Sequence, residues 1–267
     1  MLGQLVVAPG RKLRAEGDAV RLEPRLAGES PVGAGIAGSS ALNIAVCGAL
    51  AAWCERAVPD ELLLQIAQNV EAQVIDVPTG VQDYRPALYG GISAVELNVD
   101  GIRRIPLHVE PLELQKRIVL AYTNASRNSG INNWEMTKRH IDGDREVQSR
   151  FARIRDVAVA MRASLERQDW PTVGQHVADE WENRKRLAPG VSTPAIDAML
   201  DAAKAAGAWG GKVCGAGGGG CLFCIGEPDR APAIREALVA HGARLLDYRI
   251  ETEGLRIDTR VDAATVS

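Results

Sequence analysis

The sequence predicts an α+β protein of two domains. Its 267 residues, 46% hydrophobic and 24% charged, are enough for one or two domains of about 100–200 residues each. The expected helices and strands are unevenly grouped, whereas a doubly wound parallel sheet would need them to alternate. We place the boundary near Leu107–Gln115, between a domain of residues 1–110 and a domain of residues 111–267.

The first domain is expected to contain short strands, two consecutive helices and a segment broken by glycine and proline. Helix start signals and alternation of apolar residues set these limits. The expected elements are strands at Leu5–Val7 and Val20–Leu22, helices at Ser40–Cys54 and Asp60–Val74, a broken segment at Asp76–Gly91 and a strand at Ile92–Leu97.

The second domain is expected to contain longer helices and a second glycine-rich loop. Ile154, Val157, Met161 and Leu165 recur at helical spacing, which is typical of a core-facing stripe. The expected elements are a strand at Ile118–Thr123, helices at Gly143–Gln168 and Pro194–Ala206, a loop at Gly215–Gly220 between strand-like runs, a helix at Asp229–Ala240, and strands at Arg244–Ile250 and Gly254–Ile257.

Composition excludes several classes of function. The chain has 31 Lys and Arg against 34 Asp and Glu, a net charge of −3, so it lacks a basic field for nucleic acid. The longest apolar stretch, Ala41–Cys54, is shorter than a membrane span, and the N-terminus has no basic flank typical of a signal peptide. We therefore expect a cytoplasmic protein with no nucleic acid or membrane partner, and five reduced cysteines.

The loop Pro31-Val-Gly-Ala-Gly-Ile-Ala-Gly-Ser-Ser-Ala41 admits several interpretations. Gly33, Gly35 and Gly38 match a dinucleotide-binding turn, but a second helix replaces the strand that this motif needs. A P-loop would need lysine where Ser39 stands. A glycine-rich helix start capped by serine would account for one serine only. The remaining interpretation is a phosphate site, in which glycines let backbone N–H groups approach the anion at a helix N-terminus.

This loop resembles the second signature of the GHMP kinases, and Lys212-Val-Cys-Gly-Ala-Gly-Gly-Gly-Gly-Cys resembles their third. Gly80–Gly91 and Tyr122–Arg127 look most like the branch of heptose-7-phosphate kinases and fucokinases. The resemblance implies the GHMP kinase fold, with a ribosomal protein S5 domain 2-like N-terminal part and a ferredoxin-like C-terminal part. It also implies an ATP- and Mg²⁺-dependent kinase that phosphorylates a sugar or sugar phosphate.

The resemblance assigns roles to two residues between the glycine loops and to one serine at the end of the first loop. Asp83, seven residues before Gly90, matches the catalytic base; turn capping is the alternative for such an aspartate. Glu71, twelve residues before Asp83, matches the family's magnesium-binding glutamate; a solvated helix glutamate is the alternative. With Ser40 it would form a pair of hard oxygen ligands for Mg²⁺.

The remaining assignments concern the nucleotide and the acceptor. Arg127 and Tyr84 are the candidates for contact with the acceptor, although Asn124 stands where the branch has glycine before Arg127. A surface arginine without a ligand is the alternative for Arg127. The nucleotide would be held by Pro31, Gly33, Ala34, Gly35, Ile36, Ala37, Gly38, Ser39, Ser40, Gly215, Ala216, Gly217, Gly218 and Gly219.

The chain departs from the family in front of the second signature. Family members carry a first signature and several strands there, whereas this chain has 30 residues, in which Val7-Ala-Pro-Gly-Arg11 echoes the family's opening. An alternative interpretation is therefore a truncated nucleotide-binding module without turnover. The sequence leaves open which sugar is the acceptor and whether the chain forms a homodimer.

Overall fold

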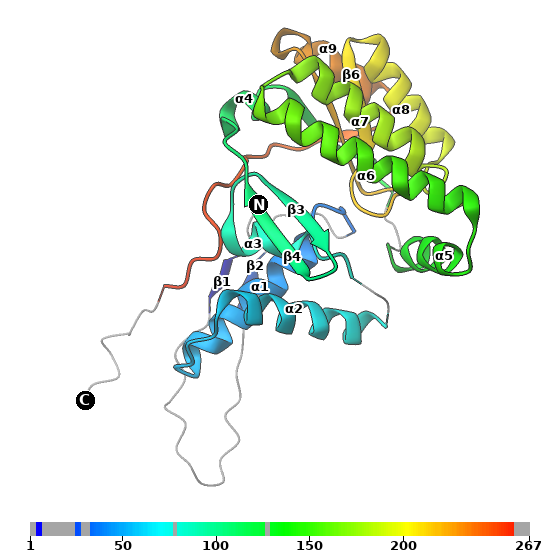
Figure 1. Cartoon of the computed structure of the whole chain (residues 1–267). Coiled ribbons are helices and arrows are strands. Elements are labelled where there is room, and N and C mark those ends of the chain that lie inside the picture. The colour runs from blue at the N-terminus through cyan, green and yellow to red at the C-terminus, as the bar shows by residue number, and fades with distance from the viewer. Residues whose placement is uncertain (1–3, 7–24, 28–32, 77–78, 126–128, 259–267) are drawn as a thin grey trace.

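The computed structural model describes residues 4–6, 25–27, 33–76, 79–125 and 129–258, which form two bodies (Figure 1). The N-terminal elements are β1 (Gln4–Val6), β2 (Arg25–Ala27), α1 (Gly38–Trp53), α2 (Asp60–Ile75), α3 (Tyr84–Tyr89), β3 (Ser93–Asn98) and β4 (Gly101–Pro106). They are followed by α4 (Pro111–Gln115), β5 (Ile118–Tyr122), α5 (Ser129–Ile141), α6 (Arg145–Glu166), α7 (Trp170–Arg184), α8 (Pro194–Ala205), β6 (Ala208–Val213), β7 (Cys221–Gly226), the 3-10 turn η1 (Pro228–Arg230), α9 (Ala231–Ala240) and β8 (Arg244–Leu245).

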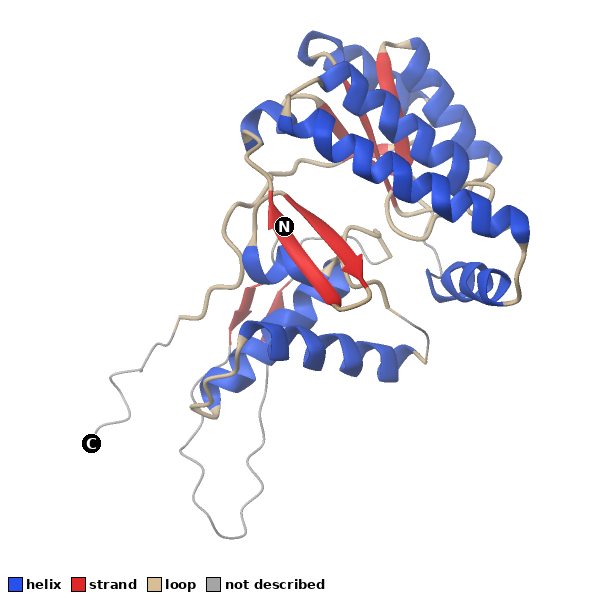
Figure 2. Ribbon diagram, in the orientation of Figure 1, coloured by secondary structure: helices blue, strands red, loops and turns tan. Residues whose placement is uncertain are grey.

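The N-terminal body is built on three helices. Helix α1 packs against α2 and α3 through a small core that includes Ile44, Leu63, Leu64, Ala67 and Leu88. The strands β1 and β2 pair with each other, and β3 and β4 form a separate antiparallel hairpin (Figure 2). This core holds α1, α2 and α3 together at the place where the predicted site residues lie.

The C-terminal body confirms the predicted ferredoxin-like part. Its four-stranded sheet has the order β6-β7-β5-β8, and every pair in it is antiparallel. The chain passes from β5 to β6 through helices that end in α8, and from β7 to β8 through α9. This order and these crossovers are those of the β-α-β-β-α-β arrangement.

Helices cover both faces of this sheet. A Cβ atom on Gly210 of β6 would meet the Gly174 carbonyl oxygen and the Ala178 amide of α7. A Cβ atom on the neighbouring Gly211 would instead meet Leu200 of α8. Successive side chains of a strand point to opposite faces, so α7 and α8 lie on opposite sides of β6. Across the described ranges, none of the helices combines the length and apolar character that crossing a bilayer demands.

The end of the described chain returns from the C-terminal body to the N-terminal one, where it runs beside α3 (Figure 1). The Gly91 amide donates to the Glu251 carbonyl at 3.0 Å, and the Leu255 amide donates to the Leu88 carbonyl at 3.0 Å. Leu255 also packs beside the core of α1, α2 and α3. The described chain therefore passes between the two bodies twice, once between β4 and β5 and again after β8, and the boundary near residues 107–115 stays a prediction.

Most predicted helices are confirmed, with ends shifted by no more than about two residues. Four helices were not predicted, namely α3, α4, α5 and α7. Strand β5 is confirmed, whereas a strand at Gly254–Ile257 is wrong, because that segment hydrogen-bonds to the end of a helix and joins no sheet. The first predicted strand corresponds to β1, and Val20–Leu22 lies outside the described residues.

Candidate functional site

The first glycine loop enters α1 through residues with left-handed backbone conformations. Gly33 and Gly35 have φ of 71° and 74°, and Ala37, at the N-cap of α1, has φ of 60°. Glycine adopts this region without strain, and the loop needs it at two nearby positions. The first turn of α1 carries no acidic side chain, so the positive end of the helix dipole keeps its attraction for an anion.

The second glycine loop lies directly against the first. The Cys221 amide, at the end of that loop, donates to the Ala34 carbonyl oxygen at 2.7 Å. A Cβ atom on Gly220 would lie 2.7 Å from the carbonyl oxygens of both Gly33 and Ala34. The two glycine motifs, separated by most of the chain, are thus neighbours, and the fit between them requires glycine at position 220.

The second loop is also held by the C-terminal body around it. The Gly218 amide donates to the Val191 carbonyl at 2.8 Å, and the Gly220 amide donates to the Ala125 carbonyl at 2.8 Å. Gly217, Gly218 and Gly219 all have positive φ. These backbone hydrogen bonds therefore fix the loop in a conformation that is strained for any residue other than glycine.

Ser40, Glu71 and Tyr84 form a hydrogen-bonded group between α1, α2 and α3. The Ser40 hydroxyl donates to Oε2 of Glu71 at 3.4 Å, and the Tyr84 hydroxyl donates to the same oxygen at 2.5 Å. Ser40 is 5% exposed and Tyr84 1% exposed. Burial, together with the hydrogen bond to Glu71, raises the pKa of Tyr84 to about 12, so its hydroxyl stays protonated at neutral pH. The structure thus brings the two predicted metal ligands into contact.

Asp83 lies at the start of α3, directly before Tyr84. It has helical backbone angles, and its carboxylate does not cap the helix. Asp83 therefore does not cap α3, and its catalytic role stays a prediction. The hydroxyl of Tyr84 binds Glu71, and Asp83 is the residue directly before Tyr84 in the sequence. The chain therefore attaches Asp83 to the group formed by Ser40, Glu71 and Tyr84.

Two predicted contact residues, Pro31 and Arg127, lie outside the described residues. Asn124, three positions before Arg127, has φ of 57°, and its side-chain amide donates to the Gly242 carbonyl at 2.8 Å. Asparagine is among the residues that tolerate this left-handed region. Asn124 can therefore stand where the resemblance expects glycine.

Tyr84, the other candidate for acceptor contact, is buried in the core of α1, α2 and α3 with its hydroxyl on Glu71. This geometry favours a role beside Glu71 over a contact with the acceptor.

An ion group around the buried carboxylate of Glu180 joins α7 to β6, the strand before the second glycine loop, and was missed in the sequence. Lys212 of β6 donates to Oε2 of Glu180 at 2.5 Å, and Arg184 donates to Oε1 of the same carboxylate at 2.5 Å. Burial alone would raise the pKa of Glu180, but Lys212 and Arg184 outweigh it and hold this pKa below its usual value. Burial also lowers the pKa of Lys212, which Glu180 partly offsets. The feature of the sequence that could have indicated this ion group is Lys212, three residues before Gly215.

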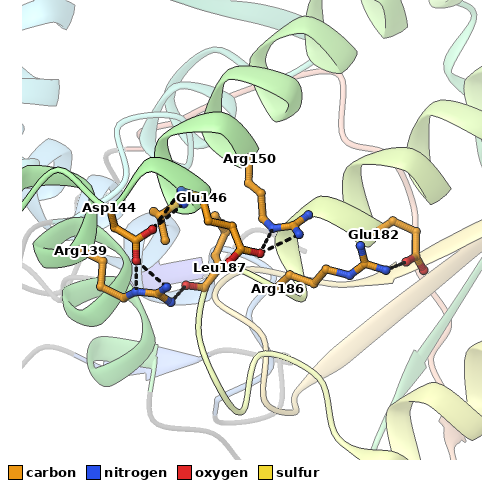
Figure 3. Close-up of polar contacts among 8 residues, drawn as sticks. Arg139, Asp144, Glu146, Arg150, Glu182, Arg186 and Leu187 are labelled. Carbon is orange, nitrogen blue, oxygen red and sulfur yellow. Dashed lines mark hydrogen bonds and ion pairs between the residues drawn. The ribbon is translucent and has the colours of Figure 1, made fainter.

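Helix α5 is attached to the rest of the C-terminal body by Arg139 (Figure 3). Its guanidinium donates to the Leu187 carbonyl at 2.8 Å and to Oδ2 of Asp144 at 2.6 and 2.9 Å. The other oxygen of Asp144 accepts from the Glu146 and Val147 amides at the start of α6. One carboxylate therefore joins α5 to α6, and Arg139 joins both to the segment after α7.

A ferredoxin-like body and a helical body whose glycine loops touch have the architecture of a two-domain small-molecule kinase. The family model described as "GHMP kinases N terminal domain" matches residues 5–91, and "GHMP kinases C terminal" matches residues 161–244. The chain belongs to the GHMP kinase family, whose members are ATP-dependent phosphotransferases.

Individual relatives agree with this membership. The chain is 28% identical over 230 residues to the D-glycero-alpha-D-manno-heptose 7-phosphate kinase of Campylobacter jejuni, covering 85% of this chain and 67% of that protein. It is 27% identical over 243 residues to the mevalonate kinase of Thermococcus onnurineus, covering 85% and 66%. The structure of Lactococcus lactis galactokinase complexed with galactose shares the fold, with a TM-score of 0.71, 22% identity and coverage of 87% and 70%. The chain thus spans about two thirds of the length of these relatives.

Proposed function

We propose that this chain transfers the γ-phosphoryl group of ATP to a hydroxyl group of a sugar or sugar phosphate, with a heptose 7-phosphate or a fucose-like sugar as the leading acceptors. The observation that supports this most is the contact between the two glycine loops, the Cys221 amide on the Ala34 carbonyl, beside the Ser40 and Glu71 pair. Family membership supports the reaction class, and the heptose 7-phosphate kinase of Campylobacter jejuni suggests the acceptor class.

The triphosphate would lie between the two loops. Backbone N–H groups at the start of α1 have no partners within the helix and, with the helix dipole, attract phosphate oxygens. Residues 33–40 would supply these groups, together with Pro31, and residues 215–219 would close on the other side. The glycines among these residues let the backbone approach the phosphates closely.

Ser40 and Glu71 have the hard oxygen donors that suit Mg²⁺. Both Ser40 and Tyr84 donate to Oε2 of Glu71, and no described side chain donates to Oε1, so Oε1 is available to a cation. When bound there, Mg²⁺ would neutralise charge that develops on the phosphate oxygens. The residues present therefore fit the ion that the family membership suggests.

Asp83 would accept the proton of the attacking hydroxyl group, which we expect to be the anomeric one. Phosphoryl transfer asks little of the protein beyond positioning and charge stabilisation, so a carboxylate directly before Tyr84, which binds Glu71, suits this task. Arg127 would bind a phosphate or hydroxyl of the acceptor as a forked donor. The domains are expected to be residues 1–110 and 111–267, each contributing one glycine loop, with residues 251–255 of the second in contact with the first.

The test is a transfer assay with ATP, Mg²⁺ and a panel of sugars and sugar phosphates. The proposal expects phosphorylation of at least one sugar, with Asp83→Asn reducing kcat by about 10²-fold or more at unchanged ATP affinity. Full activity of Asp83→Asn on the best acceptor would contradict the assignment of the base. ATP binding by calorimetry without transfer to any member of the panel would favour the nucleotide-binding module instead.

Cytoplasmic location and a homodimer remain expectations of the same proposal. Cell fractionation and light scattering of the purified chain test them.

A further inference from the structure

Tyr84 connects the helix that carries Asp83 to the carboxylate of Glu71. Its hydroxyl donates to Oε2 of Glu71 at 2.5 Å, from α3 to α2, across thirteen positions of sequence. The ring lies in the core of the N-terminal body, and Tyr84 is 1% exposed. A donor held by a packed ring has almost no freedom of its own, so it can fix the group that it binds.

Glu71 needs such a fixed donor because of where it lies. It is half-buried near the end of α2, where a glutamate side chain has several rotamers. The Ser40 hydroxyl donates to the same Oε2, but at the longer distance of 3.4 Å. With both hydroxyls on Oε2, the carboxylate presents Oε1 as the oxygen without a described side-chain donor.

We propose that Tyr84 is a positioning residue, whose hydroxyl orients the Glu71 carboxylate for a divalent cation and links α3 to the metal side of the site. The inference rests on the proposed function, because it takes Glu71 as a metal ligand. It replaces the expectation that Tyr84 contacts the acceptor. Partners that orient a ligand carboxylate commonly change metal affinity by 10–100-fold when removed.

The experiment compares Tyr84→Phe with a matched control, Tyr89→Phe. Both variants remove one hydroxyl from α3, but Tyr89 donates at 3.3 Å to the exposed Glu61. Binding of Mn²⁺ in the presence of a non-hydrolysable ATP analogue is measured by electron paramagnetic resonance, and analogue binding without metal by calorimetry. We expect Tyr84→Phe to weaken Mn²⁺ binding about tenfold, without changing metal-free analogue binding, and Tyr89→Phe to change neither.

A purely structural role for Tyr84 predicts different results. It would lower the melting temperature and reduce activity at every Mg²⁺ concentration, whereas a positioning role allows excess Mg²⁺ to restore turnover. Equal Mn²⁺ affinity in the Tyr84→Phe and Tyr89→Phe variants overturns the inference, as does a loss of activity that excess Mg²⁺ leaves unchanged.

Glu71→Gln separates failure of the inference from failure of the proposed metal site. If Glu71→Gln weakens Mn²⁺ binding and Tyr84→Phe does not, the metal site stands and the role of Tyr84 is wrong. If Glu71→Gln leaves Mn²⁺ affinity unchanged, the proposed metal site itself is wrong, and the inference falls with it.

Discussion

Gly220→Ala is expected to separate the two glycine loops. Gly220 has φ of 80°, and an added Cβ atom would lie 2.7 Å from the carbonyl oxygens of Gly33 and Ala34. The left-handed backbone costs a residue with a Cβ atom about 1–2 kcal/mol. Crowding against two backbone atoms, which cannot rotate away, adds about 1–3 kcal/mol. Relief of this strain requires a shift of the first loop away from the second.

Gly143→Ala is the matched control for Gly220→Ala. Gly143 also has a positive φ, 84°, but no atom lies within 4 Å of its added Cβ position. The control therefore carries the backbone strain of about 1–2 kcal/mol without the crowding.

Urea unfolding and steady-state kinetics with ATP distinguish the two variants. Gly220→Ala should be less stable than Gly143→Ala by about 1–3 kcal/mol. Its kcat/KM for ATP should fall about 100-fold, because a displacement near 1 Å in a positioning element can cost that much. If both variants keep the same stability and the same kcat/KM for ATP, the contact between the loops does not shape the nucleotide site.

The remaining predictions concern the ion groups of the C-terminal body. Glu180→Gln leaves the largely buried Lys212 without its anion, so the free energy of unfolding measured in urea should fall by about 3–5 kcal/mol. The double change Glu180→Met with Lys212→Met should recover most of this loss. A double variant as unstable as the single one would refute the explanation. The lowered pKa of Glu180 means that its stabilising contribution is present above about pH 4.5, the unfolded value, and is lost as the pH falls through the lower folded value. Acid should therefore destabilise the wild type more steeply than Glu180→Gln, and equal slopes would contradict this. Arg139→Ala should speed amide hydrogen exchange in α5, whereas Lys138→Ala, which breaks an exposed pair, should leave it unchanged. Equal exchange rates in the two variants would show that Arg139 does not hold α5.

The fold was predictable where local signals are strong. Helices α1 and α2 follow from a glycine-serine start and from the Pro59-Asp60-Glu61 signal, and β5 from its apolar run. Helix α7 was missed although its signals were present. At the start of α7, the Asp169 side chain accepts a hydrogen bond from the Thr172 amide at 3.4 Å. The helix also carries buried apolar side chains at helical spacing.

The strand expected at Gly254–Ile257 shows a limit of local patterns. Its apolar residues are spaced as in a strand, but the Leu255 amide bonds to Leu88, at the end of α3. Gly254 passes so close to the Leu88 carbonyl that a Cβ atom would not fit. A sequence pattern reports which residues are to be buried and not which partner buries them.

The candidate site was predictable in its composition but not in its connections. Motif resemblance singled out Ser40, Glu71 and Asp83, and the structure brings the first two into contact. The bond from Tyr84 to Glu71 depends on how α2 packs against α3, and the group around Glu180 on how α7 packs against β6. Neither of these packing arrangements produces a periodic pattern in the sequence, so these contacts could be found only in the structure.

The central claim is that the contacting glycine loops and the carboxylates beside them form a working kinase site. The most direct measurement follows radiolabelled γ-phosphate from ATP to a heptose 7-phosphate and to the other sugars of the panel, with the wild type and Asp83→Asn side by side in the presence of Mg²⁺. The account predicts a labelled sugar product with the wild type and a rate lower by about 10²-fold or more with Asp83→Asn. Equal rates for the two proteins would contradict the role of Asp83, and no labelled product from any sugar, despite ATP binding, would contradict the claim as a whole.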